Sequence, residues 1–223
     1  MEAKNRIRIA VDGPAGAGKS TVAKEIAKEL NIDYIDTGAM YRAIALKLIR
    51  TGTDYKDDEA LAEMLETTDV DFDGGRTFLD GEDVSGLIRT PEISALASPS
   101  SAAPLIREKL VSLQRAMGDR KSVIMDGRDI GTNVFTDAEF KFYLTASADE
   151  RARRRTLELQ AKGEDADFET VKAEIEKRDW QDMHRELNPL CKADDAIEID
   201  SSDMGIREVV LCMLEIIRNK YQN

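Results

Sequence analysis

The chain is poor in the residues that most often carry acid–base, redox and metal chemistry. It has one histidine, His184, and two cysteines, Cys191 and Cys212, among 223 residues. The cysteines lack the spacing of a metal site or a redox pair, so we expect two free thiols, buried or partly buried, in a reducing compartment. His184 and the single tryptophan, Trp180, are expected to be packing or surface residues. Nothing predicts a histidine-activated nucleophile.

Long apolar runs are also missing. Only three apolar residues directly precede Asp12, and no stretch approaches the length of a signal segment or a membrane span. A net charge of −12 and an isoelectric point near 4.7 oppose binding to nucleic acids and anionic membranes. We therefore expect a cytoplasmic monomer with neither kind of partner.

The chain contains one complete glycine-rich motif. Residues 13–20 read G-P-A-G-A-G-K-S, between a β-branched run at 6–12 and an amphipathic stretch at 21–30. Strand, glycine-rich loop and helix are the context of a phosphate-binding loop. Its backbone N–H groups and the helix N-terminus bind the phosphates of a nucleoside triphosphate. Lys19 adds a charge, and the Ser20 hydroxyl is expected to bind Mg²⁺.

Strands and helices alternate along most of the chain. Apolar runs predict core strands at 6–12, 32–35, 123–125, 140–144 and 196–199, and periodicity predicts helices at 39–50, 57–66, 104–117, 147–162, 168–185 and 205–220. This order favours an α/β fold with three layers and a five-stranded parallel sheet. Around 68–85, Asp-Gly turns predict a small antiparallel insertion. It is either a surface elaboration or a substrate-side subdomain.

Two further loops are candidates for a second phosphate site. Thr37 and Gly38 open a predicted helix and Arg42 lies one turn in, while Asp126 and Arg128 follow an apolar strand at the edge where α/β sheets bind ligands. Asp126 is suited to organise Mg²⁺, and either arginine can bind a phosphate or form a loop salt bridge.

Arginines also crowd the predicted helix at 147–162. Arg151 shares a face with Arg154 or Arg155, and Arg153 lies between them. These arginines form either a solvated face or a set of side chains that neutralise phosphate charge. We favour the second interpretation. The chain then turns at 161–163 into a second charged helix, so the pair could act as a lid.

The chain resembles the bacterial-type cytidylate kinases, which are nucleoside monophosphate kinases. The resemblance covers nearly the whole chain. Its motifs are Gly13-Pro-Ala-Gly-Ala-Gly-Lys-Ser-Thr21, Asp36-Thr-Gly-Ala-Met-Tyr-Arg42, Glu82-Asp-Val-Ser-Gly-Leu-Ile-Arg89, Asp126-Gly-Arg-Asp-Ile-Gly131 and Arg178-Asp-Trp-Gln-Asp-Met-His-Arg185. It implies a P-loop NTPase core (1–36, 105–147 and 188–223), a monophosphate-binding part with the insertion (37–104) and a helical lid (148–187).

The resemblance also implies roles for individual residues. The implied ATP-binding residues are Gly13, Pro14, Ala15, Gly16, Ala17, Gly18, Lys19, Ser20, Thr21, Arg151 and Arg155. Around CMP, Ser98, Arg107 and Asp129 would read cytosine, Arg178 and Asp182 would hold the sugar, Arg42, Arg128 and Arg185 would clamp the phosphate, and Thr37 stands where the family often has serine. Ser100 or Ser101 could replace Ser98. Lys19, Asp126, Arg128 and Arg185 are the expected catalytic residues.

The implied reaction transfers the γ-phosphoryl of ATP, with Mg²⁺, to CMP or dCMP. The attacking oxygen belongs to an ionised phosphate and needs no strong base, which suits a chain with one histidine. Kinases for UMP, AMP or a small metabolite such as shikimate share the first motif and remain alternatives. A guanine-nucleotide switch is disfavoured because the chain lacks Asn-Lys-x-Asp.

Overall fold

The computed structural model describes residues 6–222, which divide into two compact units. One unit is built from residues 33–123, and the other from residues 7–32 and 124–222. The strands form a five-stranded sheet in the order β2-β6-β1-β7-β8 and a three-stranded sheet in the order β3-β4-β5. The predicted five-stranded parallel sheet and the small antiparallel insertion are therefore confirmed.

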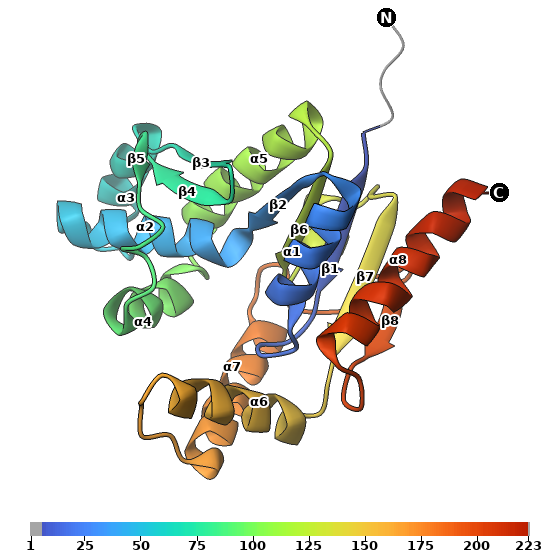
Figure 1. Ribbon diagram of the computed structural model, residues 1–223. Coiled ribbons are helices and arrows are strands. Elements are labelled where there is room, and N and C mark those ends of the chain that lie inside the picture. The colour runs from blue at the N-terminus through green and yellow to red at the C-terminus, as the bar shows by residue number, and fades with distance from the viewer. Residues whose placement is uncertain (1–5, 223) are drawn as a thin grey trace, which may run out of the picture. The chain divides into compact units, whose positions relative to one another are not determined.

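The unit built from residues 7–32 and 124–222 carries most of the parallel sheet. Its elements are β1 (Arg8–Asp12), α1 (Lys19–Leu30), β6 (Val123–Gly127), η1 (Ile130–Val134), β7 (Phe140–Thr145), α6 (Ala148–Ala161), α7 (Phe168–His184), β8 (Ile197–Asp200) and α8 (Ile206–Gln222). β1 and β7 run parallel with Ile9 opposite Phe140, and β7 pairs in parallel with β8. Helices α1 and α8 lie side by side along these strands (Figure 1).

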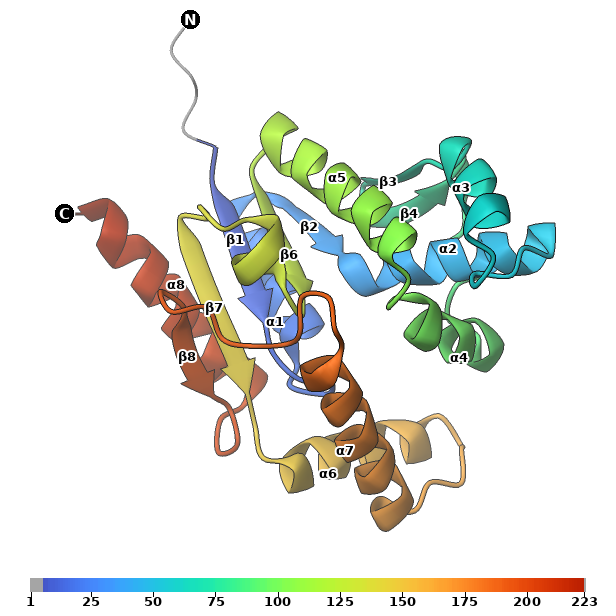
Figure 2. The same ribbon diagram turned by 180° about the vertical axis from the view of Figure 1, so that it is seen from behind.

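Helices α6 and α7 form an antiparallel hairpin after β7 (Figure 2). Ala152, Val171 and Ile175 are buried between the two helices, with Leu159 and Phe168 packed against them. Each helix starts at a side-chain cap. The Ser147 hydroxyl caps α6, and the Asp167 carboxylate caps α7. The hairpin thus has its own small core, as its periodicity predicts.

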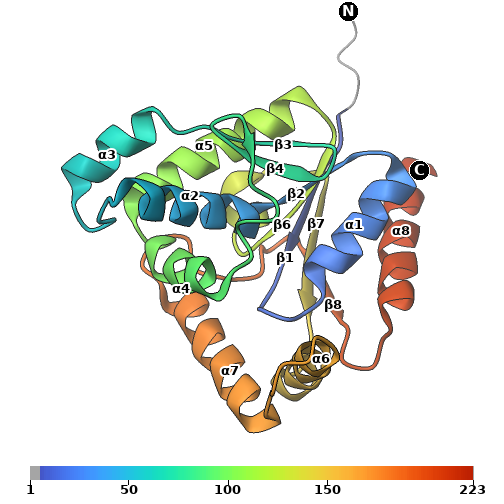
Figure 3. The ribbon, with the colours of Figure 1, turned by 60° about the vertical axis from the view of Figure 1, so that its left-hand side comes forward.

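The unit of residues 33–123 contains the insertion. Its elements are β2 (Asp33–Asp36), α2 (Thr37–Thr51), α3 (Asp58–Glu66), β3 (Val70–Asp73), β4 (Arg76–Leu79), β5 (Glu82–Asp83), α4 (Pro91–Ser100) and α5 (Pro104–Arg120). The small sheet packs on α2 and α5 (Figure 3). Gly74 and Gly75 form the β3–β4 turn, both with the positive φ that a two-residue hairpin favours.

Several details differ from the sequence-based expectation. Helix α4 and the π-helical turn η1 were not predicted, although Thr90 before Pro91 is a recognisable helix start. Cys191 is exposed rather than buried, because it lies in an irregular segment before β8, whereas Cys212 is partly buried in α8. As expected, Trp180 and His184 lie on the surface, where their rings stack. Within residues 6–222, none of the helices has the length and apolar character of a bilayer span.

Candidate active site

The glycine-rich loop leaves β1 and enters α1 with the shape that phosphate binding requires. Gly13, Gly16 and Gly18 all have positive φ, so successive peptide N–H groups can turn toward one centre. A Cβ on Gly13 would lie 2.0 Å from the Leu144 carbonyl oxygen in β7, so only glycine fits there. Lys19 is 5% exposed, and its ammonium donates to the Pro14 carbonyl at 2.7 Å, which folds the side chain back over the loop.

Lys19 lies among charged groups of both signs. Burial lowers the pKa of Lys19 well below its usual value, and the nearby charge of Arg128 lowers it further. Arg178 acts in the same direction, while Asp126 and Asp12 favour the charged form. Burial and the charge of Arg128 thus oppose the charged form of Lys19, and a bound anion such as a phosphate would favour it.

Ser20 and Asp126 form the oxygen pair that Mg²⁺ would need. The Ser20 hydroxyl donates to the Asp126 carboxylate at 2.7 Å, at the start of α1 and the end of β6. Mg²⁺ bound with a nucleotide usually takes only one or two protein oxygens, the rest coming from phosphates and water. The pair therefore fits the ion, although no cluster of three or more acidic, His or Cys ligands occurs within residues 6–222.

Asp12 is a site residue that the sequence analysis did not identify. Its carboxylate is buried and accepts hydrogen bonds from the backbone N–H groups of Ile130 (2.8 Å) and Gly131 (2.7 Å). Burial raises its pKa to about 6 despite these bonds. Asp12 thereby ties the start of the phosphate loop to the turn after Asp129. Its place at the end of an apolar strand, like that of Asp126, was the available signal.

Two ion pairs join the loop after β6 to the end of α7. Arg128 Nε donates to Asp182 Oδ2 at 2.7 Å, and Arg185 Nη2 donates to Asp129 Oδ1 at 2.9 Å. All four side chains are less than one-fifth exposed. The structure therefore brings together four residues that the resemblance assigns to CMP. Arg178, from the same set, lies on the exposed side of α7.

Arg151, expected to bind ATP, lies against the phosphate loop. It is 6% exposed and forms an ion pair with Asp179 of α7. Asp179 has no signal in the sequence, because 28 residues separate it from Arg151 and no local pattern connects them. Arg155 is more exposed and pairs with Glu158 on its own helix.

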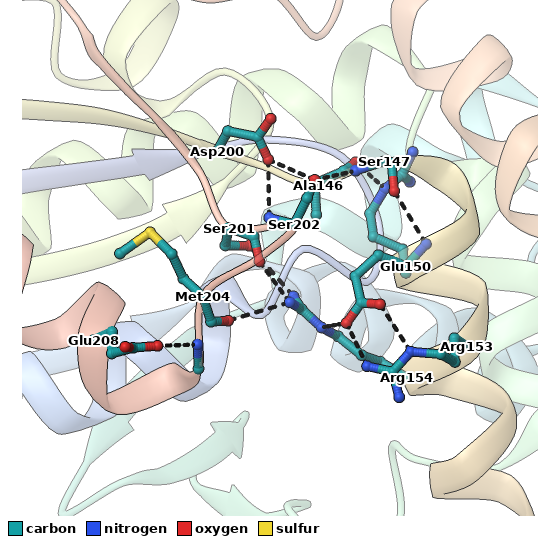
Figure 4. A network of polar contacts seen from close by, with 12 residues as sticks. Ala146, Ser147, Glu150, Arg153, Arg154, Asp200, Ser201, Ser202, Met204 and Glu208 are labelled. Atoms are coloured by element: carbon teal, nitrogen blue, oxygen red, sulfur yellow. Dashed lines mark hydrogen bonds and ion pairs between the residues drawn. The ribbon is translucent and has the colours of Figure 1, made fainter.

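Arg153 and Arg154 contact protein groups in the structure. Both guanidinium groups bind Glu150, and these bonds, that of Arg153 foremost, hold the pKa of the Glu150 carboxyl at about 2. Arg154 also donates to the Ser201 and Met204 carbonyls at 2.6 and 3.3 Å (Figure 4). It thus fixes the first turns of α6 to the segment between β8 and α8.

The first half of the expected CMP set lies in the unit of residues 33–123. Asp36 caps α2 by accepting from Ala39 N, and its other oxygen accepts from Arg42 at 3.1 Å. A Cβ on Gly38 would lie 3.1 Å from both side chains, so glycine lets them meet. Thr37 is the buried first residue of α2. The Arg42 Nε atom is buried without a hydrogen-bond acceptor.

Ser98 and Arg107 lie on α4 and α5 of the same unit. Ser98 is exposed, whereas the hydroxyls of Ser100 and Ser101 donate to carbonyls of their own segment at 2.8 and 2.7 Å. The hydroxyls of Ser100 and Ser101 are thus bound within the segment, and which of the three serines contacts a ligand stays a prediction. Arg107 is 3% exposed, and its guanidinium lies 5.9 Å from the centre of the Tyr41 ring.

Comparison with known proteins connects these features to one family. The family model described as "Cytidylate kinase" matches residues 9–219. A cytidylate kinase of Caldanaerobacter subterraneus subsp. tengcongensis is 53% identical over 212 residues, 95% of each chain. One of Caldicellulosiruptor bescii is 49% identical over 222 residues, 98% of each chain.

Among solved structures, an uncharacterized protein from Eubacterium ventriosum has a similar fold, with a TM-score of 0.53 and 18% identity over 96% of this chain and 99% of that one. The family model and the two relatives match nearly the whole chain, including the phosphate loop and the turn after β6. The chain belongs to the cytidylate kinase family.

Proposed function

We propose that this protein transfers the γ-phosphoryl group of ATP to CMP or dCMP, forming CDP or dCDP. The observation that carries the proposal is the buried Lys19 folded over a glycine-rich phosphate loop, in a chain of the cytidylate kinase family. Two polyanions repel, and this cationic site is suited to hold a donor and an acceptor phosphate. The attacking phosphate oxygen is already ionised, so the reaction needs no general base.

The phosphate loop would bind the donor. The backbone N–H groups of residues 13–21 are proposed to bind the ATP phosphates, with Lys19 contacting the transferred group. Arg151 and Arg155 are proposed to contribute further charge to ATP. Mg²⁺, held by Ser20 with Asp126 organising its waters, would supply charge neutralisation on the phosphates when bound.

The acceptor would be held by arginines that form ion pairs with aspartates in the structure. Arg128 and Arg185 are presented by Asp182 and Asp129, and with Arg42 they are proposed to clamp the CMP phosphate. Asp182 and Arg178 are proposed to contact the sugar. The base-reading residues are proposed to be Ser98, Arg107 and Asp129, with Thr37 also contacting CMP.

The residue types around the base favour cytosine over uracil. A carboxylate such as Asp129 can accept from the exocyclic amine of cytosine, and an arginine can donate to the ring nitrogen and carbonyl. Uracil lacks that amine donor, so its complex would lose the hydrogen bond to the carboxylate, at a cost of about 1–3 kcal/mol. This predicts roughly a tenfold to hundredfold preference for CMP over UMP.

A panel of acceptors tests the proposal. The purified protein is supplied with ATP and Mg²⁺ and with CMP, dCMP, UMP, AMP or shikimate, and ADP release is followed. We expect release with CMP and dCMP, weak release with UMP and background rates with the others. ADP release only with shikimate or AMP would refute it. Calorimetry that detects no CMP binding beside a non-hydrolysable ATP analogue would refute it as well.

A further inference from the structure

A carboxylate on helix α7 faces inward although its neighbours face solvent. Asp179 is 8% exposed, whereas Trp180 is 62% exposed and Arg178 is also exposed. Desolvation of a carboxylate is unfavourable unless it is paired and hydrogen bonded. The contacts of Asp179 therefore indicate what the buried charge does.

Asp179 binds both the phosphate loop and an arginine of the neighbouring helix. Its Oδ1 atom accepts from the Ala15 backbone N–H at 3.2 Å, and its Oδ2 atom accepts from Arg151 Nη1 at 2.5 Å. Arg151 Nη1 also donates to the Ala15 carbonyl at 2.9 Å. Both backbone polar groups of Ala15 are thus held by this one ion pair, which we call the Ala15 clasp.

The clasp acts on the part of the loop that regular structure does not support. Ala15 lies between β1 and α1, directly before Gly16, whose φ is +76°. Arg151 packs close by, since a Cβ on Gly16 would be 3.4 Å from the Arg151 Cβ. A loop that binds phosphate through its backbone depends on the orientation of its peptides. Asp179 and Arg151 fix the orientation of two of them.

The Arg151 guanidinium is held at two of its nitrogen atoms, Nε and Nη1, and the third takes no part in the clasp. Its Nε donates to the Ala146 carbonyl at 2.9 Å, just after β7, and its Nη1 makes the two contacts to Ala15 and Asp179. The Nη2 atom takes part in none of these contacts. A guanidinium fixed at Nε and Nη1 has its plane determined, so Nη2 is aimed in one direction.

We propose that Asp179 is a positioning residue for the nucleoside triphosphate. It does not contact the nucleotide; it holds Arg151 and the tip of the phosphate loop in the arrangement that binds the triphosphate. Asp179 therefore serves the donor side, whereas Arg178 and Asp182 of the same helix are proposed to serve the acceptor. The assignment rests on the proposed function for its activity readout.

The Asp179→Asn variant tests this role, because it keeps the shape of the side chain and removes its charge. We expect the dissociation constant for a non-hydrolysable ATP analogue and the KM for ATP to rise at least tenfold. The KM for CMP should stay within twofold. Glu174→Gln is the matched control, since it also neutralises a carboxylate on α7 but at an exposed position. It should leave both constants unchanged. Circular dichroism reports whether each variant is folded.

A double variant keeps the test decisive if Asp179→Asn folds poorly. Combining it with Arg151→Met removes both charges of the buried pair, which proteins tolerate better than the loss of one partner. Because Asp179 acts partly through Arg151 and partly on Ala15 directly, the double variant should lose less affinity for the ATP analogue than the sum of the two single-variant losses. Additive losses, or an unchanged ATP constant in Asp179→Asn, would overturn the proposal. Wild-type protein that binds the analogue but does not phosphorylate CMP would instead refute the proposed function.

Discussion

Replacing Gly13 by alanine should destabilise the protein strongly. The new Cβ would lie 2.0 Å from the Leu144 carbonyl oxygen and 3.0 Å from its carbonyl carbon, and both atoms are backbone. Leu144 belongs to β7, which is paired with β8 on one side and with β1 on the other. The strand cannot retreat without disturbing these ladders, so the clash cannot be relieved by a side-chain rotation.

The magnitude follows from two contributions. Gly13 has φ of +145°, a conformation that costs an alanine about 1–3 kcal/mol. Forcing an extra methyl group against a packed backbone costs about 1–3 kcal/mol more. The expected loss of unfolding free energy is therefore about 2–6 kcal/mol, a large part of the 5–15 kcal/mol typical of a folded protein.

Urea unfolding at 25 °C, followed by circular dichroism, measures this loss. Gly86→Ala is the matched control, because Gly86 has no positive φ and its added Cβ would meet no atom within 4 Å. The control should change the unfolding free energy by less than about 0.5 kcal/mol. If Gly13→Ala lost less than about 1 kcal/mol with an unchanged denaturant slope, the argument from the close approach to β7 would be wrong.

Three further predictions concern the charged groups. Lys19→Met should lower kcat about 10²–10³-fold, and near-normal turnover would contradict the loop assignment. The melting temperature should not fall, because burial holds the pKa of Lys19 well below its usual value and its charge therefore opposes folding. Arg185→Ala removes the cation paired with the buried Asp129 carboxylate, which still accepts from the Asn133 side chain, so urea unfolding should show a loss of about 1–3 kcal/mol and kinetics a raised KM for CMP; an unchanged KM would remove Arg185 from the acceptor site. The pKa of Asp12 is raised from 3.8 to about 6, so its contribution to stability is complete below pH 3.8 and is lost as the pH rises through 6. The unfolding free energy of the wild type relative to Asp12→Asn should therefore be about 1.4 kcal/mol higher at pH 5 than at pH 8, and a pH-independent difference would contradict the raised pKa.

The parts of the fold that could be predicted from the sequence are those with a local signal. The five parallel strands follow from short apolar runs, and the β3–β4 hairpin follows from Asp73-Gly-Gly75. Helix α4 was missed because Pro99 and the small residues around it weaken its periodicity. The η1 turn depends on the Asp12 carboxylate, which accepts from two of its N–H groups across 118 residues of sequence.

In the candidate active site, too, residues with a local sequence signal could be predicted and residues that act on distant positions could not. The phosphate loop, with Lys19 and Ser20, could be recognised because all of its residues are consecutive. The partners that orient the charges could not, since Asp12 and Asp179 act on residues more than 100 positions away. The ion pairs Arg128–Asp182 and Arg185–Asp129 join residues that the sequence analysis named individually but did not pair. Motifs therefore predict which side chains take part in the reaction. They predict less well which residues orient those side chains.

The contacts of Arg154 have a consequence for how the α6–α7 hairpin can move. Its bonds to Ser201 and to the Met204 carbonyl anchor the base of α6 to the strand end that leads into α8. A swinging motion of the hairpin about its base would have to break all of these at once. Bending beyond Arg155, toward the turn at Gly163, breaks none of them. Motion of the hairpin that keeps these bonds is therefore limited to the part beyond Arg155.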